Sequence, residues 1–284
     1  MLTKDKKILI VGLGMIGASY AEKLHSLGYY VGGLSRRQST IDTAIEQGII
    51  NAGSIDVTKS FVGYFDIVIF ALYPKAFVEW IEQHQKCFKS GALITDVTGV
   101  KGAIVSKIQD MLRSDVEFIA AHPMAGRETS GIESRNPKVF EGANYIVTPT
   151  AANTQGAIDT ACEIGRILGF GQISILSPEE HDEMIAFLSQ LTHCIAVSLM
   201  CCKDSKHLVD YTGDSFRDLT RIANINENMW PELFAMNKEQ LLEQMGLFQK
   251  EFSRLKEAIA ADDLETVKQM MITSTERRKL FNKK

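Results

Sequence analysis

The stretch KILIVGLGMIG at residues 7–17 decides the fold of this chain. Its first part, residues 8–11, is a continuous apolar run, the pattern of a strand buried on both faces of a sheet. Glycines in G-x-G-x-x-G spacing follow, and residues 18–27 then have the pattern of a helix. This arrangement suits a dinucleotide pyrophosphate, because the backbone can approach it closely and the helix N-terminus attracts negative charge. We therefore expect six loop residues to bind a nucleotide: Gly12, Leu13, Gly14, Met15, Ile16 and Gly17.

Length and composition are those of an ordinary globular protein. The chain has 284 residues, 45% hydrophobic and 23% charged, which is enough for two domains. Its net charge of −4 provides no general attraction for nucleic acid or an anionic membrane. We expect neither a signal segment nor an apolar stretch of the roughly 20 residues that span a bilayer. The five cysteines, odd in number and without C-x-x-C spacing, favour reduced thiols in a cytoplasmic protein.

The first part of the chain alternates short apolar runs with amphipathic segments, which is typical of a parallel α/β sheet. We predict a Rossmann-type nucleotide-binding domain over residues 1–176. Further strands are expected at 30–34, 66–72, 92–95, 117–121, 144–147 and 172–176. Helices are expected at 41–47, 76–88, 103–112 and 156–168.

Residues 177–284 have no strand pattern and predict an all-helical substrate and dimerisation domain. Two apolar stripes recur at helical spacing, one over residues 184–199 and one over residues 241–259. Such stripes could simply form a domain core. Because the whole region is helical and one helix is very apolar, we favour a homodimer built through it.

The end of the second predicted strand bears on the choice of cofactor. An NAD site usually has an acidic residue there to bind the ribose hydroxyls, whereas this chain has Ser35, Arg36 and Arg37. A hydroxyl and a guanidinium suit a 2′-phosphate, so we expect NADP, with NAD as the alternative. Both arginines could instead be solvated surface residues. Leu72 and Tyr73, at the end of the next strand, are expected to line the same cofactor site.

His122 follows an apolar strand and precedes Pro123, which we expect to end that strand. Oxidation of an alcohol by hydride transfer requires a base, and neutral imidazole is suitable near pH 7. A hydrogen-bonded structural histidine is the alternative. His181 is interpreted as a residue that caps a helix start.

Arg217 and Arg221 share one face of a predicted helix and need anionic partners. A substrate carboxylate is one candidate, and an internal pair with Asp214 or Asp218 is the other.

Five motifs together resemble the prephenate/arogenate dehydrogenase family of tyrosine biosynthesis: GLGMIGAS, DVTGVKG, AAHPMAGRETSG, SQLTH and FRDLTRIAN. The resemblance implies oxidative decarboxylation of prephenate to 4-hydroxyphenylpyruvate, with hydride transfer to NAD(P)+ and without a metal. Arogenate is the alternative substrate.

The resemblance also implies residue roles. His122 matches the base, and Glu128 matches an acidic residue over the pocket entrance. Gly99 stands where members often have serine, and the adjacent Thr98 could replace that hydroxyl. Lys101 matches a lysine at the junction of cofactor and substrate. Three more residues match positions on the substrate side: His193, Arg221 and Trp230. Gln190 is expected to contact substrate as well, although SQLTH differs there, and at Thr192, from the SHLPH that is common in the family.

Two other classes compete with this interpretation. The β-hydroxyacid dehydrogenases also join a Rossmann domain to helices, but they need a lysine with an asparagine four residues later on the long helix. This chain has no lysine there before Lys203, and no asparagine follows it at that spacing. A non-catalytic NADP-sensing protein would bind cofactor without turnover, and the presence of His122 and Arg221 argues against it.

Overall fold

The computed structural model describes residues 2–126, 129–204 and 206–281. The chain divides into two compact units, Met1–Asn237 and Lys238–Lys284.

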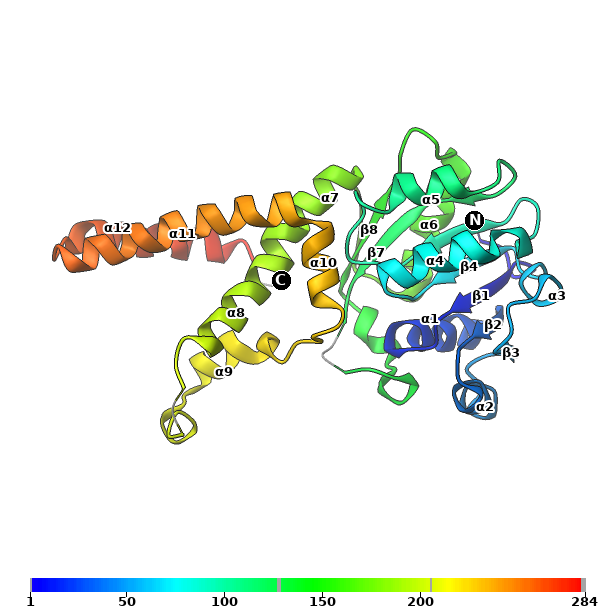
Figure 1. Cartoon of the computed structure of the whole chain (residues 1–284), viewed down its shortest axis with the longest axis horizontal. Helices are drawn as coiled ribbons and strands as arrows, with labels where there is room; N and C mark the ends of the chain where they lie inside the picture. Colours follow the sequence, from blue (N-terminus) through cyan, green and yellow to red (C-terminus); the bar gives the residue numbers. More distant parts are fainter. Residues whose placement is uncertain (1, 127–128, 205, 282–284) are drawn as a thin grey trace. The chain divides into compact units, whose positions relative to one another are not determined.

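The first unit is built on a six-stranded parallel sheet with strand order β3-β2-β1-β4-β5-β6 (Figure 1). This order is that of a doubly wound Rossmann fold, so the predicted fold class is confirmed. The sequence pattern did not predict the short β3, which has only three residues. The strands are β1 (Lys7–Val11), β2 (Tyr30–Leu34), β3 (Ala52–Ser54), β4 (Ile67–Phe70), β5 (Leu93–Asp96) and β6 (Glu117–Phe118).

Helices cover both faces of this sheet because alternate residues of each strand point to opposite sides. In β1, Ile8 and Ile10 join the core beneath α1 and α6, whereas Leu9 and Val11 join the core beneath α4 and α5. The helices are α1 (Met15–Ser26), α2 (Gln38–Glu46), α3 (Lys59–Val62), α4 (Pro74–His84), α5 (Val105–Met111) and α6 (Gln155–Leu168). Short 3-10 turns also occur in this unit, among them η1 (Gln85–Cys87), η2 (Ile132–Ser134), η3 (Pro137–Phe140) and η5 (Val209–Tyr211).

The middle of the chain forms a second sheet of three strands, β7-β8-β9. Strand β7 (Ala120–Met124) pairs antiparallel with β8 (Asn144–Thr148), which pairs parallel with β9 (Gln172–Ile175). The prediction of one strand over 117–121, ended by Pro123, is therefore wrong. The chain leaves the first sheet after β6, and Pro123 lies inside β7 opposite Tyr145. An edge strand tolerates proline, because one of its sides lacks a backbone partner.

The described elements that follow β9 are all helical, as predicted. Helix α7 contacts β8 and α10 contacts α4, so the first compact unit extends to Asn237. The predicted boundary between a nucleotide-binding domain and a helical domain, at 176/177, does not coincide with this division into compact units. It stays a prediction. In the first unit these helices are α7 (Pro178–Ile185), the π-helical turn η4 (Ala186–Leu191), α8 (Thr192–Cys201), α9 (Asp214–Thr220), the 3-10 turn η6 (Arg221–Ala223) and α10 (Trp230–Met236). The second unit consists of α11 (Lys238–Ala260) and α12 (Leu264–Lys279).

The stretch from α7 to α8 is more apolar than expected. Pro178–Cys201 is long and apolar enough to cross a membrane by length and composition, which corrects the expectation that no such stretch exists. The same property is common in helices of soluble proteins and is weak evidence for a membrane. Only 28% of its most apolar window is buried within the structure. Several of its large apolar side chains are exposed, among them Phe187 at 52% and Leu188 at 49%.

Candidate active site

The glycine loop has the geometry that its sequence predicts. Gly12 adopts a φ of +97°, and a Cβ there would lie 2.5 Å from the carbonyl oxygen of Ala71. A Cβ on Gly17 would lie 1.9 Å from the carbonyl oxygen of Gly12, so neither position accepts another residue. Gly14, the N-cap of α1, has nothing within 4 Å of its Cβ position. The loop therefore leaves open backbone at the helix N-terminus, as a phosphate cradle requires.

The other loop residues have different roles. Leu13 and Met15 are buried, and Leu13 packs against Gly33 of β2. Their side chains support the loop, so any nucleotide contact from these two positions is through the backbone. Ile16 is partly buried and packs against the same core.

The remaining predicted cofactor residues lie at the carboxyl ends of β2 and β4. Ser35 is half-buried, and its Oγ accepts a hydrogen bond of 3.4 Å from the backbone N–H of Arg37. Arg36 and Arg37 are exposed. Leu72 lies beside the glycine loop, with a methyl group 2.9 Å from the Cβ position of Gly12. Tyr73 is exposed, and its hydroxyl accepts a hydrogen bond from the Asn226 amide.

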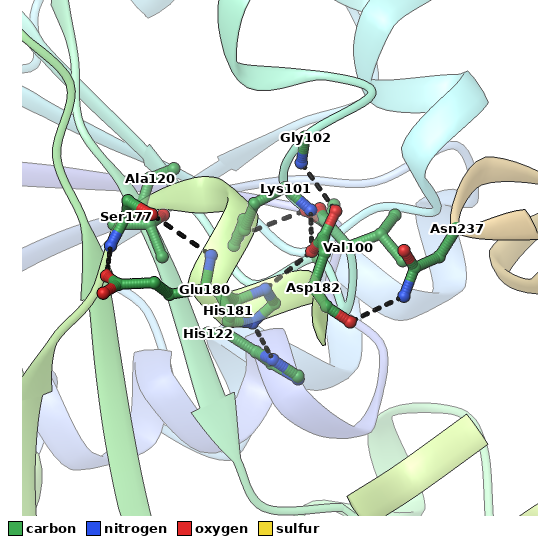
Figure 2. Close-up of polar contacts among 12 residues, drawn as sticks. Val100, Lys101, Gly102, Ala120, His122, Ser177, Glu180, His181, Asp182 and Asn237 are labelled. Carbon is green, nitrogen blue, oxygen red and sulfur yellow. Dashed lines mark hydrogen bonds and ion pairs between the residues drawn. The ribbon is translucent and has the colours of Figure 1, made fainter. Parts of the chain in front are cut away.

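His122, in β7, begins a chain of hydrogen bonds that leads into α7 (Figure 2). Its Nδ1 lies 2.9 Å from Nε2 of His181, and Nδ1 of His181 lies 2.7 Å from Oδ1 of Asp182. The Asp182 carboxylate accepts backbone N–H groups from Lys101 at 2.8 Å and Gly102 at 2.7 Å. His181 is fully buried, and Asp182 is 5% exposed.

The start of α7 is defined locally. Ser177 and Glu180 form a capping box in which each side chain bonds the other's backbone N–H, and Pro178 occupies the first turn. His181 and Asp182 follow directly and point toward β7 and the loop after β5 (Figure 2). His181 therefore contacts His122 and does not cap the helix, so the capping interpretation is wrong.

Lys101 is not a substrate contact in this structure. Its side chain is 0% exposed, and its ammonium donates to Asp96 Oδ2 at 2.7 Å, to the Ala121 carbonyl at 2.6 Å and to Thr98 Oγ1 at 3.3 Å. Asp96 Oδ1 in turn accepts the backbone N–H of Ala121 at 3.1 Å. The Asp96–Lys101 pair thus binds both the N–H and the carbonyl group of Ala121, the residue before His122. This contact lies where β7 of the second sheet passes the end of β5 in the first.

Gly99, not Thr98, faces the reactive side of His122. A Cβ on Gly99 would lie 3.8 Å from both Nε2 of His122 and a methyl group of Leu233. The hydroxyl of Thr98 donates to Asp96 and lies 3.1 Å from the Val100 carbonyl oxygen, and Thr98 is 3% exposed. The expectation that Thr98 replaces the serine hydroxyl is not supported, because its hydroxyl is directed into the Asp96–Lys101 pair.

Burial determines the electrostatics of this region. It holds the pKa of His122 well below its usual range, and positive charge on His181 or Lys101 would lower it further. Burial also lowers the pKa of His181, against the opposing effect of Asp182. Both imidazoles are therefore neutral near pH 7, and His122 can accept a proton.

Two predicted substrate residues in the helical region contact each other. The rings of His193 and Trp230 stack at a centroid distance of 3.8 Å. Nδ1 of His193 lies 2.8 Å from the Ser189 carbonyl, to which it donates. Ser189 belongs to the π-helical turn η4, a feature often found at functional sites.

Gln190 is a buried structural residue. It is 1% exposed, its amide nitrogen donates to the Leu233 carbonyl at 2.9 Å, and its oxygen accepts from Asn237 at 2.9 Å. The prediction that it contacts substrate is not supported, because both polar ends are occupied.

The arginines of the FRDLTRIAN motif separate into two cases. Arg217 pairs with Asp214 at 3.0 Å, which is the internal pair considered from the sequence. Arg221 is exposed in η6 and has interaction partners of its own, so its role as a carboxylate ligand stays a prediction. Glu128 lies outside the described residues.

A Rossmann sheet with an open glycine loop, together with a neutral histidine in the adjoining strand β7, defines a dinucleotide-dependent dehydrogenase architecture. The family profile described as "Prephenate dehydrogenase, nucleotide-binding domain" matches residues 20–169, and "Prephenate dehydrogenase, dimerization domain" matches residues 177–273. The chain belongs to the prephenate dehydrogenase family.

Curated relatives agree. A prephenate dehydrogenase of Lactococcus lactis subsp. cremoris is 30% identical over 275 residues, which is 92% of this chain and 73% of the relative. A cyclohexadienyl dehydrogenase of Zymomonas mobilis is 28% identical over 270 residues, which is 92% of this chain and 91% of the relative.

Solved structures show the same relationship. A prephenate dehydrogenase from A. aeolicus, in complex with hydroxyphenyl propionate and NAD+, has a TM-score of 0.89 at 28% identity, covering 98% of each chain. Synechocystis arogenate dehydrogenase has a TM-score of 0.84 at 25% identity, covering 97% of this chain and 100% of that one. A Mycobacterium tuberculosis 3-hydroxyisobutyrate dehydrogenase has a TM-score of 0.54 at 14% identity, covering 79% and 72%, and shares only the fold.

Proposed function

We propose that this protein oxidatively decarboxylates prephenate to 4-hydroxyphenylpyruvate in tyrosine biosynthesis, with NAD(P)+ as hydride acceptor. The observation that carries the proposal is the position of His122. Its Nε2 lies next to Gly99, and the preceding residue, Ala121, is hydrogen-bonded to Asp96 at the carboxyl end of β5. Strand β5 belongs to the sheet that also carries the glycine loop. Ligands of open α/β sheets bind at this edge.

The reaction needs a base for the proton of the ring hydroxyl. The ring hydroxyl gives its proton to Nε2 of His122, and the ring carbon gives up a hydride and becomes a carbonyl carbon. The carboxylate then leaves as CO₂, its bonding electrons make the ring aromatic, and the resulting phenolate oxygen takes the proton back from His122. When bound, the nicotinamide supplies the hydride acceptor. The residues of this chain orient the base and keep it neutral.

Prephenate is favoured over arogenate by His193. Prephenate carries a keto acid in its side chain, and arogenate carries an ammonium group there. An imidazole held against Trp230 suits the keto acid and offers no negative charge to an ammonium. The similarity to Synechocystis arogenate dehydrogenase makes arogenate the second candidate.

The proposed cofactor is NADP, with NAD as the alternative. Ser35 and the exposed Arg36 follow β2, and no carboxylate in the stretch 34–37 would repel a 2′-phosphate. The A. aeolicus structure contains NAD+, which is why NAD remains the alternative.

The proposed assembly is a homodimer formed through the helical region. Exposed apolar side chains on α7, η4 and α8 need cover, and this part of the chain matches a dimerization domain. Further exposed apolar residues lie along α11, including Phe248 at 39% and Phe252 at 60%. A cytoplasmic location agrees with five free cysteines.

The direct test follows reduced-cofactor absorbance with prephenate and arogenate, each with NADP and NAD. We expect the highest kcat/KM with prephenate and NADP, and a smaller preference for prephenate in His193→Val. A higher kcat/KM for arogenate would contradict the substrate assignment. Cofactor binding with no turnover of either substrate would favour the NADP-sensing alternative.

A further inference from the structure

We propose that His181 and Asp182 are positioning residues that hold His122 in the one tautomer whose Nε2 can accept a proton. The proposal rests on the proposed function, because it assigns the state of the base in that reaction. The argument follows the hydrogen bonds from Asp182 to His122, one bond at a time.

Asp182 determines which nitrogen of His181 carries hydrogen. Both of its carboxylate oxygens accept backbone N–H groups, from Lys101 on Oδ1 and from Gly102 on Oδ2. This is the environment of an ionised carboxylate, which can only accept hydrogen bonds. Nδ1 of His181, 2.7 Å from Oδ1, must therefore be the donor.

His181 in turn determines the hydrogen on His122. A neutral imidazole with its proton on Nδ1 has a lone pair on Nε2. That lone pair lies 2.9 Å from Nδ1 of His122, so His122 carries its proton on Nδ1 and donates it to His181. Burial of His181 disfavours its charged form, so near pH 7 its Nε2 stays unprotonated and can accept the hydrogen bond from His122.

Nε2 of His122 then bears a lone pair on the side of the ring next to Gly99, where a Cβ would lie 3.8 Å from Nε2. The opposite tautomer would place an N–H there, and the ring could not take up a substrate proton. Once His122 has accepted a proton, its Nδ1–H still donates to His181, and the Asp182 carboxylate lies at the end of the same chain of hydrogen bonds. Among the described residues, Lys101 also acts electrostatically on the His122 ring, and its ammonium pairs with Asp96.

Asp182 also has a structural role, since it ties α7 to the loop after β5. The first test therefore measures the tautomer itself and does not depend on turnover. In the protein with ¹⁵N-labelled histidine, the resonances that disappear in His122→Asn are those of His122. We expect a protonated Nδ1 and an unprotonated Nε2 at neutral pH. A protonated Nε2 in the neutral ring would overturn the proposal.

The kinetic test compares matched variants. His181→Gln keeps an acceptor for the His122 N–H, whereas His181→Leu has similar size without one. We expect His181→Leu to lower kcat by about tenfold or more relative to His181→Gln, the effect of leaving one buried N–H unpaired. His25→Gln, which changes a histidine paired with Asn51 at the surface, is the control and should retain wild-type kcat.

Asp182→Asn completes the test, because an amide can donate to His181 and reverse both tautomers. We expect kcat to fall by about 10²–10⁴, since loss of the aspartate that orients a histidine base costs about 10⁴ in serine proteases. Cofactor Kd should change little, and the acid limb of kcat should move to lower pH because a nearby negative charge is lost. Equal loss in His181→Gln and His181→Leu, or an unchanged limb and kcat in Asp182→Asn, would refute the positioning role. If the wild type turns over neither substrate, the proposed function fails while the tautomer measurement still decides this inference.

Discussion

Nδ1 of His122 lies 2.9 Å from Nε2 of His181, with the two rings inclined at 63°. The contact joins β7 of the second sheet to the first turns of α7, across 59 residues of sequence. It makes the candidate base part of a buried chain that ends at Asp182 and the backbone of the loop after β5. Three sets of substitutions and a pH profile test this region, and a further set tests the loop after β2.

The role of His122 as base is tested by His122→Asn, which keeps a hydrogen-bonding side chain but cannot accept a proton. We expect kcat to fall by about 10²–10⁴ while cofactor affinity is retained. Steady-state kinetics and a fluorescence titration with cofactor measure the two quantities. Near-normal turnover in this variant would remove His122 from the mechanism.

The pH dependence of kcat/KM should report the lowered pKa of His122. The base works only when neutral, and burial lowers the pKa at which it becomes protonated. Activity should therefore persist as the pH falls through about 6.5, the ordinary histidine value, and decline only below it. The measurement is kcat/KM across the acid range, with protein stability recorded at each pH. An acid limb above the ordinary value would contradict the burial argument.

The space beside Gly99 should admit a small side chain but not a larger one. A Cβ there meets no atom closer than 3.8 Å, so Gly99→Ser should fold normally and place a hydroxyl near Nε2 of His122. We expect it to keep or raise kcat/KM, whereas Gly99→Val should lower it by about tenfold or more by occupying substrate space. Thermal unfolding of both variants is the control. Equal kinetics of the two variants would show that substrate does not approach this position.

Breaking the buried Asp96–Lys101 pair should destabilise the protein. Lys101→Met leaves Asp96 charged and uncompensated, at a cost of about 3–5 kcal/mol in the free energy of unfolding. Adding Asp96→Asn should recover part of this loss. The exposed pair Arg166–Glu163 is the matched control, and Arg166→Met should cost about 1 kcal/mol or less. Urea unfolding compares the four proteins, and similar losses for Lys101→Met and Arg166→Met would contradict the argument.

Cofactor preference should depend on the loop after β2. Arg36→Ala removes a guanidinium that can bind a 2′-phosphate, so the Kd for NADP should rise by about tenfold or more while the Kd for NAD changes little. Ser35→Asp combined with Arg36→Ala should reverse the preference in kcat/KM, because a carboxylate repels the 2′-phosphate. An unchanged NADP/NAD ratio would mean that this loop does not contact the phosphate.

Much of the architecture could be predicted from local patterns, and the errors have identifiable causes. Strands such as β1 and β4 are continuous apolar runs because both faces are buried. The pattern at 117–121 was also apolar, but two short strands in different sheets share it, and periodicity does not reveal such a break. Lys101 and Gln190 were expected to contact substrate because they lie at family positions on the substrate side. In this fold their polar ends are saturated by buried partners.

The sequence by itself determined the nucleotide loop, the helical character of the region after residue 177 and the family, because these depend on contacts and motifs within short stretches of chain. Only the tertiary structure decided what surrounds His122. His181 and Asp182 read as the start of a helix, and nothing in their local pattern indicates a partner 59 residues earlier. Their role arises because the packing of α7 against β7 removes these groups from water, and buried polar groups must then pair with one another.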